Sequence, residues 1–140
     1  MPTSKSDLRK LTKLGKKATP SRTLEVFPNH APGQITVTLH CSEFTCLCPM
    51  TGQPDYAVID ISYVPDKLVV ESKSVKLYLE TFRNEGIFHE HLAVHIAKDF
   101  VACLKPISID VTVKFHVRGG IAIDAAYHWD KKSKSKIKLL

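Results

Sequence analysis

The stretch from Glu43 to Asp55, EFTCLCPMTGQPD, is expected to form a loop that places a thiol and a carboxylate a few residues apart. A cysteine attacks as its thiolate, and a nearby carboxyl group can give a proton to the group that the sulfur has attacked. Two prolines and a glycine restrict the backbone between Cys48 and Asp55, which predicts a shaped loop. Cys48 and Asp55 are therefore a candidate nucleophile and general acid. On spacing alone, it is commoner for Cys48 to be a buried small residue and for Asp55 to be a turn former.

A second group of polar residues, ESKSVKLY, begins at Glu71. Lys73 and Lys76 are three residues apart, so in a helix their amines lie near one another at its N-terminal end. Backbone N–H groups and lysines together suit a phosphate. A capped helix with a solvated basic face is the plainer alternative.

The third feature is the pair His89-Glu90. A buried glutamate that faces a ligand can accept hydrogen bonds from the N–H groups of a purine-like edge. A histidine can donate to a carbonyl group or relay a proton. Taken as an isolated dipeptide, the pair would more often be an exposed helix start.

Hydrophobic periodicity indicates the elements that must position these residues. Helical spacing of Val75, Tyr78, Leu79 and Phe82 predicts a helix from Ser72, with Gly86 as its left-handed stop. A second helix is expected over about 89–104, before Pro106. Apolar and polar residues alternate over 35–42, 57–63, 107–118 and 121–129, with a short apolar run at 68–70 and a Gly119-Gly120 hairpin turn.

The predicted order is strand, strand, helix, helix, strand, strand. Two hairpins around a helical pair give an antiparallel four-stranded sheet with both helices on one face, an α+β domain. Such a sheet leaves two edges exposed, and subunits can cover them by joining sheets into a closed barrel. We therefore expect a homo-oligomer.

Composition indicates a single globular domain: 140 residues, 44% hydrophobic and 24% charged. The net charge of +6 is concentrated in a basic lead-in, 1–19, and a basic tail, 131–140, around a domain at 20–130. No apolar run suits a membrane span or a signal peptide, so we expect a cytoplasmic protein with reduced thiols. Direct nucleic-acid binding is disfavoured, because no aromatic residues are interleaved with the terminal lysines.

These features, with Phe82-Arg83-Asn84 and Phe88-His89-Glu90, resemble the NADPH-dependent 7-cyano-7-deazaguanine reductases of queuosine biosynthesis, in their short single-domain form. The resemblance covers about residues 20–130. The segment from Glu71 matches the signature of that family at every position: Glu, Ser or Leu, Lys, Ser or Ala, a hydrophobic residue, Lys, Leu or Tyr, and an aromatic residue.

The resemblance implies the tunnelling fold, with sites between subunits of two stacked rings. It implies that Cys48 attacks the nitrile carbon to give a covalent thioimide and that Asp55 donates a proton. It also implies that two NADPH molecules, without a metal, reduce the nitrile to the amine in the biosynthesis of queuosine for tRNA. It further implies substrate contacts from Val70, Glu71, Ser72, His89 and Glu90, and NADPH phosphate contacts from Lys73 and Lys76. No Gly-x-Gly-x-x-Gly sequence supports a Rossmann-type cofactor site.

Two other functions compete with this reading. GTP cyclohydrolase I shares the tunnelling fold and uses zinc, for which His40, Cys41, Cys46, Cys48 and His89 offer nitrogen and sulfur ligands. Cys-x-Cys is poor zinc spacing, however, and the signature from Glu71 belongs to the reductases. A nucleic-acid-binding module with basic ends leaves the Cys48 loop unexplained. The sequence also leaves open whether Cys46 is a mere neighbour of Cys48 or a resolving thiol, although a mere neighbour is favoured, and whether Cys103 forms a disulfide.

Overall fold

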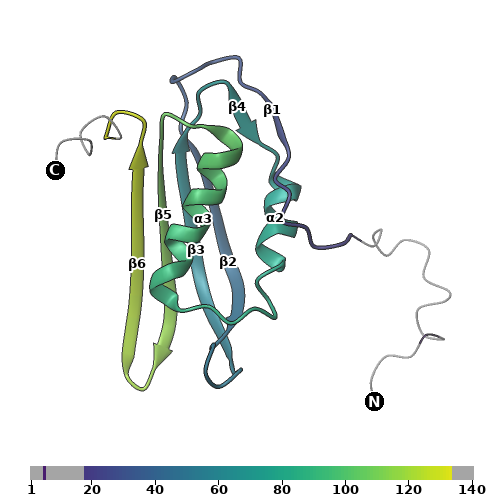
Figure 1. Ribbon diagram of the computed structural model, residues 1–140, viewed down its shortest axis with the longest axis vertical. Coiled ribbons are helices and arrows are strands. Elements are labelled where there is room, and N and C mark those ends of the chain that lie inside the picture. Colours follow the sequence, from purple (N-terminus) through teal and green to yellow (C-terminus); the bar gives the residue numbers. More distant parts are fainter. Residues whose placement is uncertain (1–4, 6–17, 134–140) are drawn as a thin grey trace.

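The computed structural model describes residues 5 and 18–133, and its elements carry the labels of Figure 1. Four long strands form an antiparallel sheet in the spatial order β2-β3-β5-β6, and β1 pairs with β4 in a separate two-stranded sheet. The α+β order expected from the sequence is confirmed. The elements are β1 (Val26–Pro28), β2 (Val37–Leu47), β3 (Pro54–Val64), β4 (Leu68–Val70), α2 (Ser72–Glu80), α3 (His89–Leu104), β5 (Ser108–Arg118) and β6 (Ile121–Asp130).

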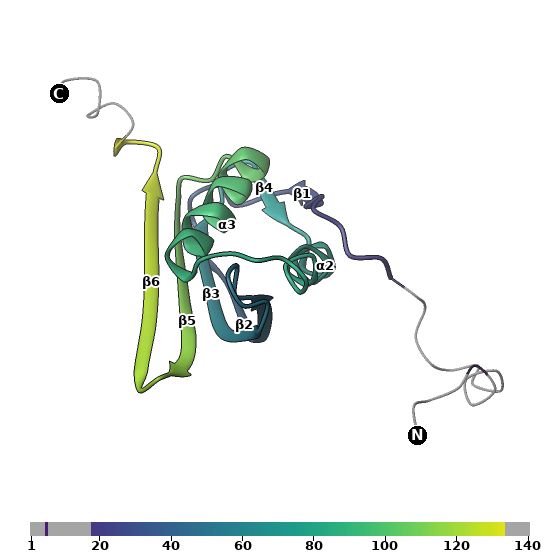
Figure 2. The ribbon, with the colours of Figure 1, turned by 60° about the horizontal axis from the view of Figure 1, so that its bottom comes forward.

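Both helices lie on the same side of the long sheet, and α3 packs over β5 and β6 (Figure 2). The core between these layers is largely aromatic at its centre. The Tyr78 ring meets Phe82 edge-on at 5.4 Å and Phe100 at 6.1 Å, which joins α2 to α3. Tyr63, from β3, packs against Phe100 and accepts a hydrogen bond from Val70 N at 3.0 Å. This packing fixes where α2 begins relative to the sheet.

A β-bulge in β2 changes which residues face the core. Cys41 lies opposite Ile59 and Phe44 opposite Ala57, so β2 uses one residue more than β3 over this interval. Val37, Leu39 and Cys41 are the inward positions before the bulge, whereas Phe44 and Cys46 are buried after it. The predicted strand stopped at residue 42 because alternation breaks at the bulge, and the strand in fact continues to Leu47.

A second bulge lies near the end of β5. Phe115 pairs with Ile123 and Arg118 with Ile121, so β5 has one residue more than β6 here. Without a bulge, Arg118 would lie on the same outward face as Asp110 and Lys114, because side chains alternate along a strand. The extra residue instead turns Arg118 to the inward face, where it contacts Asp55. Gly119 and Gly120 then form the expected two-residue turn, with φ of 57° and 78°.

Two expectations for the connecting segments were wrong. The Cys48 loop is shorter than predicted, since Glu43 to Leu47 belong to β2 and Asp55 belongs to β3. Gly86 does not have a positive φ, and α2 ends at Glu80 with a turn that follows. A Cβ atom at Gly86 would lie 2.9 Å from Pro49 Cα, so close approach of two backbones, not a left-handed conformation, requires the glycine. The pair β1–β4 was not anticipated.

Candidate active site

The turn from β2 to β3 carries Cys48 and lies at the same end of the sheet as the β5–β6 turn (Figure 1). Cys48 N donates to Gln53 O at 2.8 Å, and Gly52 N donates to Cys48 O at 2.9 Å. These bonds close a compact loop on the strand ends, with Gly52 at a φ of 69°. The half-buried thiol is thus held by backbone geometry, as expected for a shaped loop.

The environment of the Cys48 thiol favours the thiolate. The Thr51 hydroxyl, then the backbone N–H groups of Thr51 and Met50, lower the Cys48 pKa to about 7, and the charge of Arg118 acts in the same direction. A thiol with this pKa is substantially ionised at neutral pH and is a competent nucleophile.

Asp55 is the second central group, and it is 2% exposed. His89 Nε2 lies 3.0 Å from Asp55 Oδ2, and the Arg118 guanidinium forms an ion pair with the other carboxylate oxygen. The His89 ring stacks on Phe115 with centroids 3.5 Å apart and planes 8° apart, which fixes the imidazole. Two cationic or proton-bearing groups therefore hold one buried carboxylate.

Cys46 connects the thiol and the carboxylate in space. It pairs with Asp55 across the β2–β3 ladder, and it is fully buried. Burial first, and then the charges of Asp55 and Cys48, raise the Cys46 pKa to about 11. Both candidate catalytic groups thus lie around Cys46, which itself stays a thiol and is chemically quiet near neutral pH.

Arg118 and Thr51 belong to the site, and the sequence did not single them out. Arg118 reaches Asp55 only because the β5 bulge changes its face, and simple alternation places it on the opposite side of the sheet. Thr51 contacts the thiol through the local turn. No sequence motif predicts a role for either residue.

The predicted phosphate-binding helix start is built differently. Glu71 is the N-cap of α2, and its carboxylate accepts hydrogen bonds from Lys73 N and Ser74 N, each at 2.8 Å. These bonds hold the Glu71 pKa below its ordinary value. The backbone amides expected to hold a phosphate are therefore already used. The side chains of Ser72, Lys73 and Lys76 are exposed there.

A groove of about 600 Å³ lies between β2 and α2. Its apolar floor includes Leu39, Phe44 and Ile61, and Ser72, Lys76 and Arg83 line it from the helix side. The groove has the volume of a small-molecule site. Val70 ends β4 and Glu71 caps α2, whereas Glu90 is exposed in the first turn of α3. The structure thus brings His89 to Asp55 beside Cys48, but leaves the α2 residues apart.

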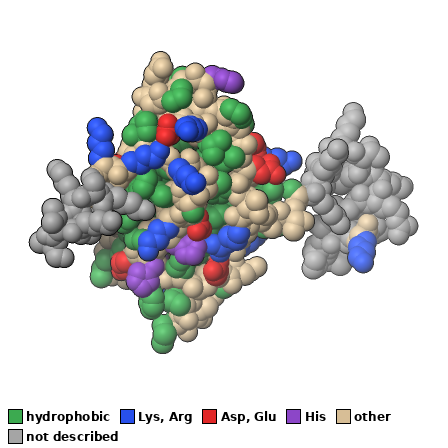
Figure 3. All heavy atoms as spheres, turned by 45° about the horizontal axis from the view of Figure 1, so that its top comes forward, with side chains coloured by type: hydrophobic (Ala, Val, Ile, Leu, Met, Phe, Trp, Pro, Cys, Tyr) green, Lys and Arg blue, Asp and Glu red, His purple; other side chains and the backbone are tan. Residues whose placement is uncertain are grey.

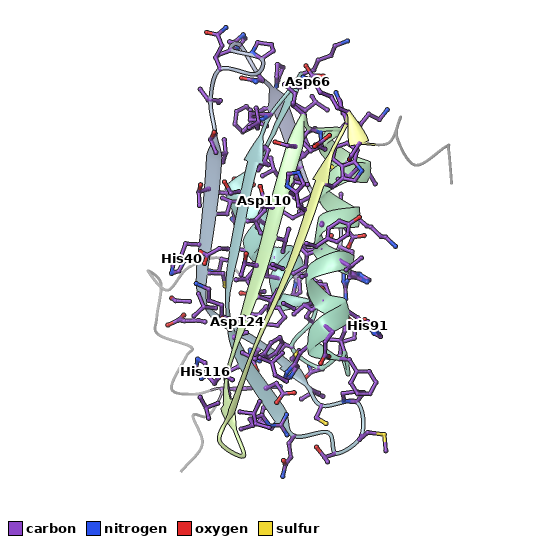
Figure 4. All side chains as sticks on the ribbon, turned by 90° about the vertical axis from the view of Figure 1, so that its left-hand side faces the viewer. His40, Asp66, His91, Asp110, His116 and Asp124 are labelled. Carbon is purple, nitrogen blue, oxygen red and sulfur yellow. The ribbon has the colours of Figure 1, made fainter. Side chains whose placement is uncertain are left out.

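The candidate zinc ligands do not converge. His40 lies on the side of the sheet away from the helices (Figure 4) and pairs with Asp60, whereas His89 contacts the buried Asp55. Among residues 5 and 18–133, no group of three or more His, Cys, Asp or Glu side chains could hold a metal ion. The four cysteines are free. That the reaction needs no metal stays a prediction.

The nucleic-acid alternative depends on the basic ends, which lie mostly outside the described residues. On the face shown in Figure 3, Lys and Arg side chains lie beside Asp, Glu and His, with hydrophobic side chains between them. This mixture differs from a basic stripe that follows a phosphate backbone. In the part of the chain that the structure describes, no helix is long and apolar enough to cross a membrane.

Comparison with known proteins gives a consistent family. The model of the family described as QueF-like protein matches residues 54–134. A protein of Syntrophus aciditrophicus named NADPH-dependent 7-cyano-7-deazaguanine reductase is 53% identical over 135 residues, 96% of each chain. A protein of the same name from Frankia casuarinae is 56% identical over 117 residues, 83% of this chain and 93% of its own.

A solved structure has a similar fold. The crystal structure of the archaeosine synthase QueF-Like in the apo form matches with a TM-score of 0.62 and 25% identity, over 66% of this chain and 91% of that chain. The fold and the family model together define a QueF-like protein with the tunnelling fold. More specifically, the chain belongs to the family of NADPH-dependent 7-cyano-7-deazaguanine reductases.

Proposed function

We propose that this protein uses NADPH to reduce the nitrile of 7-cyano-7-deazaguanine to 7-aminomethyl-7-deazaguanine, in queuosine biosynthesis for tRNA. One observation carries the proposal: a Cys48 thiol with a pKa of about 7 beside the buried Asp55 carboxylate, in a chain of this reductase family. A nitrile is a poor hydride acceptor until a nucleophile has added to its carbon. A thiolate at neutral pH supplies that nucleophile.

The chemistry then follows from the groups around Cys48. Its sulfur forms a bond to the nitrile carbon, a π-electron pair moves to the nitrogen, and the nitrogen takes a proton, giving a thioimide. Asp55, with His89 3.0 Å away, is proposed to deliver that proton. Two NADPH molecules, bound in turn, would each supply one hydride to this carbon, and the nitrogen takes a second proton in the course of the two reductions. The carbon–sulfur bond breaks between the two reductions, and Cys48 leaves as a thiolate, ready for another turnover.

Lys73 and Lys76 are proposed to contact the NADPH phosphates. Both side chains are exposed on α2, and Lys76 with Ser72 lines the 600 Å³ groove, so the charge and the space fit the cofactor. Because Glu71 occupies the backbone amides of Lys73 and Ser74, this role falls to the lysine ammonium groups and not to those amides. Val70, Glu71, Ser72, His89 and Glu90 are proposed to contact the deazaguanine.

The complete site is proposed to form between subunits of a homo-oligomer of two stacked rings. Within one chain, the Cys48 loop lies at the lower end of the sheet in Figure 1, whereas α2 begins toward the opposite end, beside β4. A neighbouring subunit can bring its own α2 start to Cys48. The edge strands β2 and β6 offer unpaired backbone groups through which sheets of adjacent subunits can join.

The deciding experiment incubates reduced protein with 7-cyano-7-deazaguanine without NADPH and measures the intact mass. We expect an added mass equal to that of the nitrile, lost on addition of NADPH and absent in Cys48→Ala. Folded, reduced protein that forms no adduct, and that does not oxidise NADPH with this substrate, would contradict the proposal.

A further inference from the structure

The segment Glu85–Ile87, between α2 and α3, pairs with the last residue before the Cys48 loop. Leu47 N donates to Glu85 O at 2.9 Å, and Ile87 N donates to Leu47 O at 3.2 Å. These two bonds form a parallel bridge between Leu47 and Gly86. We call Glu85, Gly86 and Ile87 the brace. It fixes the backbone on the side of Cys48 that the β2–β3 ladder leaves open.

Contact between Gly86 and Pro49 makes the brace specific to the loop. An added Cβ at Gly86 would lie 2.9 Å from Pro49 Cα and 3.3 Å from Pro49 Cβ. The first of these atoms belongs to the backbone and cannot rotate away. Pro49 directly precedes Met50 and Thr51, whose N–H groups and hydroxyl stabilise the Cys48 thiolate. Displacement of Pro49 therefore moves the donors that set the thiol pKa.

Arg22 holds the brace from its other side. Its guanidinium forms an ion pair with the Glu85 carboxylate and lies 3.8 Å from the centroid of the Phe82 ring. Arg22 Nη1 also lies 3.2 Å from His95 Nε2 on α3. An ion pair this exposed contributes little alone, but stacking on an aromatic face and a second polar contact restrict the guanidinium.

The brace also leads to the other half of the site. Ile87 is followed by Phe88, the N-cap of α3, and then by His89, which contacts Asp55. One short segment thus touches the nucleophile loop through Leu47 and Pro49, and delivers the imidazole two residues later. We propose that the brace, anchored by Arg22, positions the Cys48 loop and sets the reactivity of its thiol, with Gly86 as the principal positioning residue.

The test is the pH profile of Cys48 alkylation by iodoacetamide in the full chain, followed by peptide mass spectrometry, with Cys48→Ser as the blank. In Gly86→Ala we expect the midpoint to rise by roughly half to one pH unit, the size of one weakened hydrogen bond to a charged group. Glu85→Gln and Arg22→Gln should give smaller shifts in the same direction. Lys131→Gln, which removes an exposed ion pair with Asp66 at the other end of the sheet, is the matched control (Figure 4).

A folded Gly86→Ala protein with the wild-type midpoint would overturn the proposal. If Gly86→Ala does not fold, the Arg22 and Glu85 variants decide: a shift in both, with Lys131→Gln unchanged, supports positioning, and no shift in either refutes it. The effect on turnover depends on the proposed function, whereas alkylation needs no nitrile substrate. A protein that alkylates as expected but reduces no nitrile would contradict the proposed function and leave the brace supported.

Discussion

The two polar regions that the sequence singled out differ in how complete they are within one chain. Around Cys48, the proposed nucleophile has a pKa of about 7, and the buried Asp55 carboxylate contacts the His89 imidazole and the Arg118 guanidinium. At the start of α2, the charged groups either cap their own helix, as Glu71 does, or extend into solvent, as Lys73 and Lys76 do. The first region is held together by its own contacts, whereas the lysines of the second extend into solvent.

This difference separates bond formation from cofactor binding. The groups proposed for attack on the nitrile need a fixed geometry and are held by burial, ring stacking and backbone hydrogen bonds. Groups that bind a diffusing, multiply charged molecule must remain hydrated and accessible until it arrives. Variants in the two regions should therefore affect different steps.

The largest effect is expected for Cys48→Ala. Loss of the sulfur removes covalent catalysis, so turnover should fall by roughly a thousandfold or more, with no adduct. Cys46→Ala is the matched control, because that thiol is buried with a pKa of about 11 and should still permit adduct formation. Adduct formation by folded Cys48→Ala, measured by intact mass, would show that another residue is the nucleophile.

Asp55→Asn should lower turnover by about a hundredfold, since a general acid typically contributes that much or more. The amide retains the size of the side chain but cannot donate as an acid, and it leaves Arg118 without its ion-pair partner. His89→Asn should have a smaller effect of the same kind. The measurement is the steady-state rate of each variant, with circular dichroism to check that it is folded. Unchanged turnover in Asp55→Asn would show that Asp55 has no catalytic role.

Changes at α2 should act on the cofactor alone. Lys73→Gln with Lys76→Gln should raise the KM for NADPH by about tenfold or more, the worth of a charge-assisted hydrogen bond. Adduct formation, which needs no NADPH, should be unchanged. Lys98→Gln, an exposed lysine on α3, is the control. A lowered adduct yield in the double variant would contradict this prediction, because it would show that the α2 lysines also affect bond formation at Cys48.

Mixing subunits tests whether the regions come from different chains. Cys48→Ala subunits combined with Lys73→Gln/Lys76→Gln subunits should recover activity at low NADPH, since some sites then pair an intact thiol with intact lysines. Cys48→Ala combined with Asp55→Asn should recover none, because both residues come from one chain. Recovery in both mixtures, or in neither, would contradict a site shared between subunits in this way.

The smallest effect concerns pH. With a Cys48 pKa of about 7, the thiolate fraction and hence the alkylation rate should rise as pH increases from about 6 to 8. Thr51→Val removes the strongest stabilising contact, so the midpoint should move upward by less than about one unit. Thr38→Val, on the outward face of the sheet, should leave it unchanged. A midpoint near 9 in the wild type would show that the loop does not activate the thiol.

Much of the fold was readable because periodicity reports burial directly. Both helices and the β5–β6 hairpin follow their apolar spacing, and α3 covers the 89–104 expected. Even Asp55 was readable as an inward position, since it is in phase with Ala57, Ile59 and Ile61. The full length of β2 could not be predicted from the sequence, because its bulge shifts the phase of the alternation by one residue.

The sequence by itself determined the α+β order, the Cys48 and Asp55 pair, and the family signature from Glu71, since these depend on residue types and local spacing. The tertiary structure alone decided that Arg118 faces Asp55, that Gly86 lies against Pro49, and that Glu71 occupies the amides of its own helix. Those contacts depend on one-residue changes of register and on backbones meeting from distant segments. Local periodicity carries no record of either.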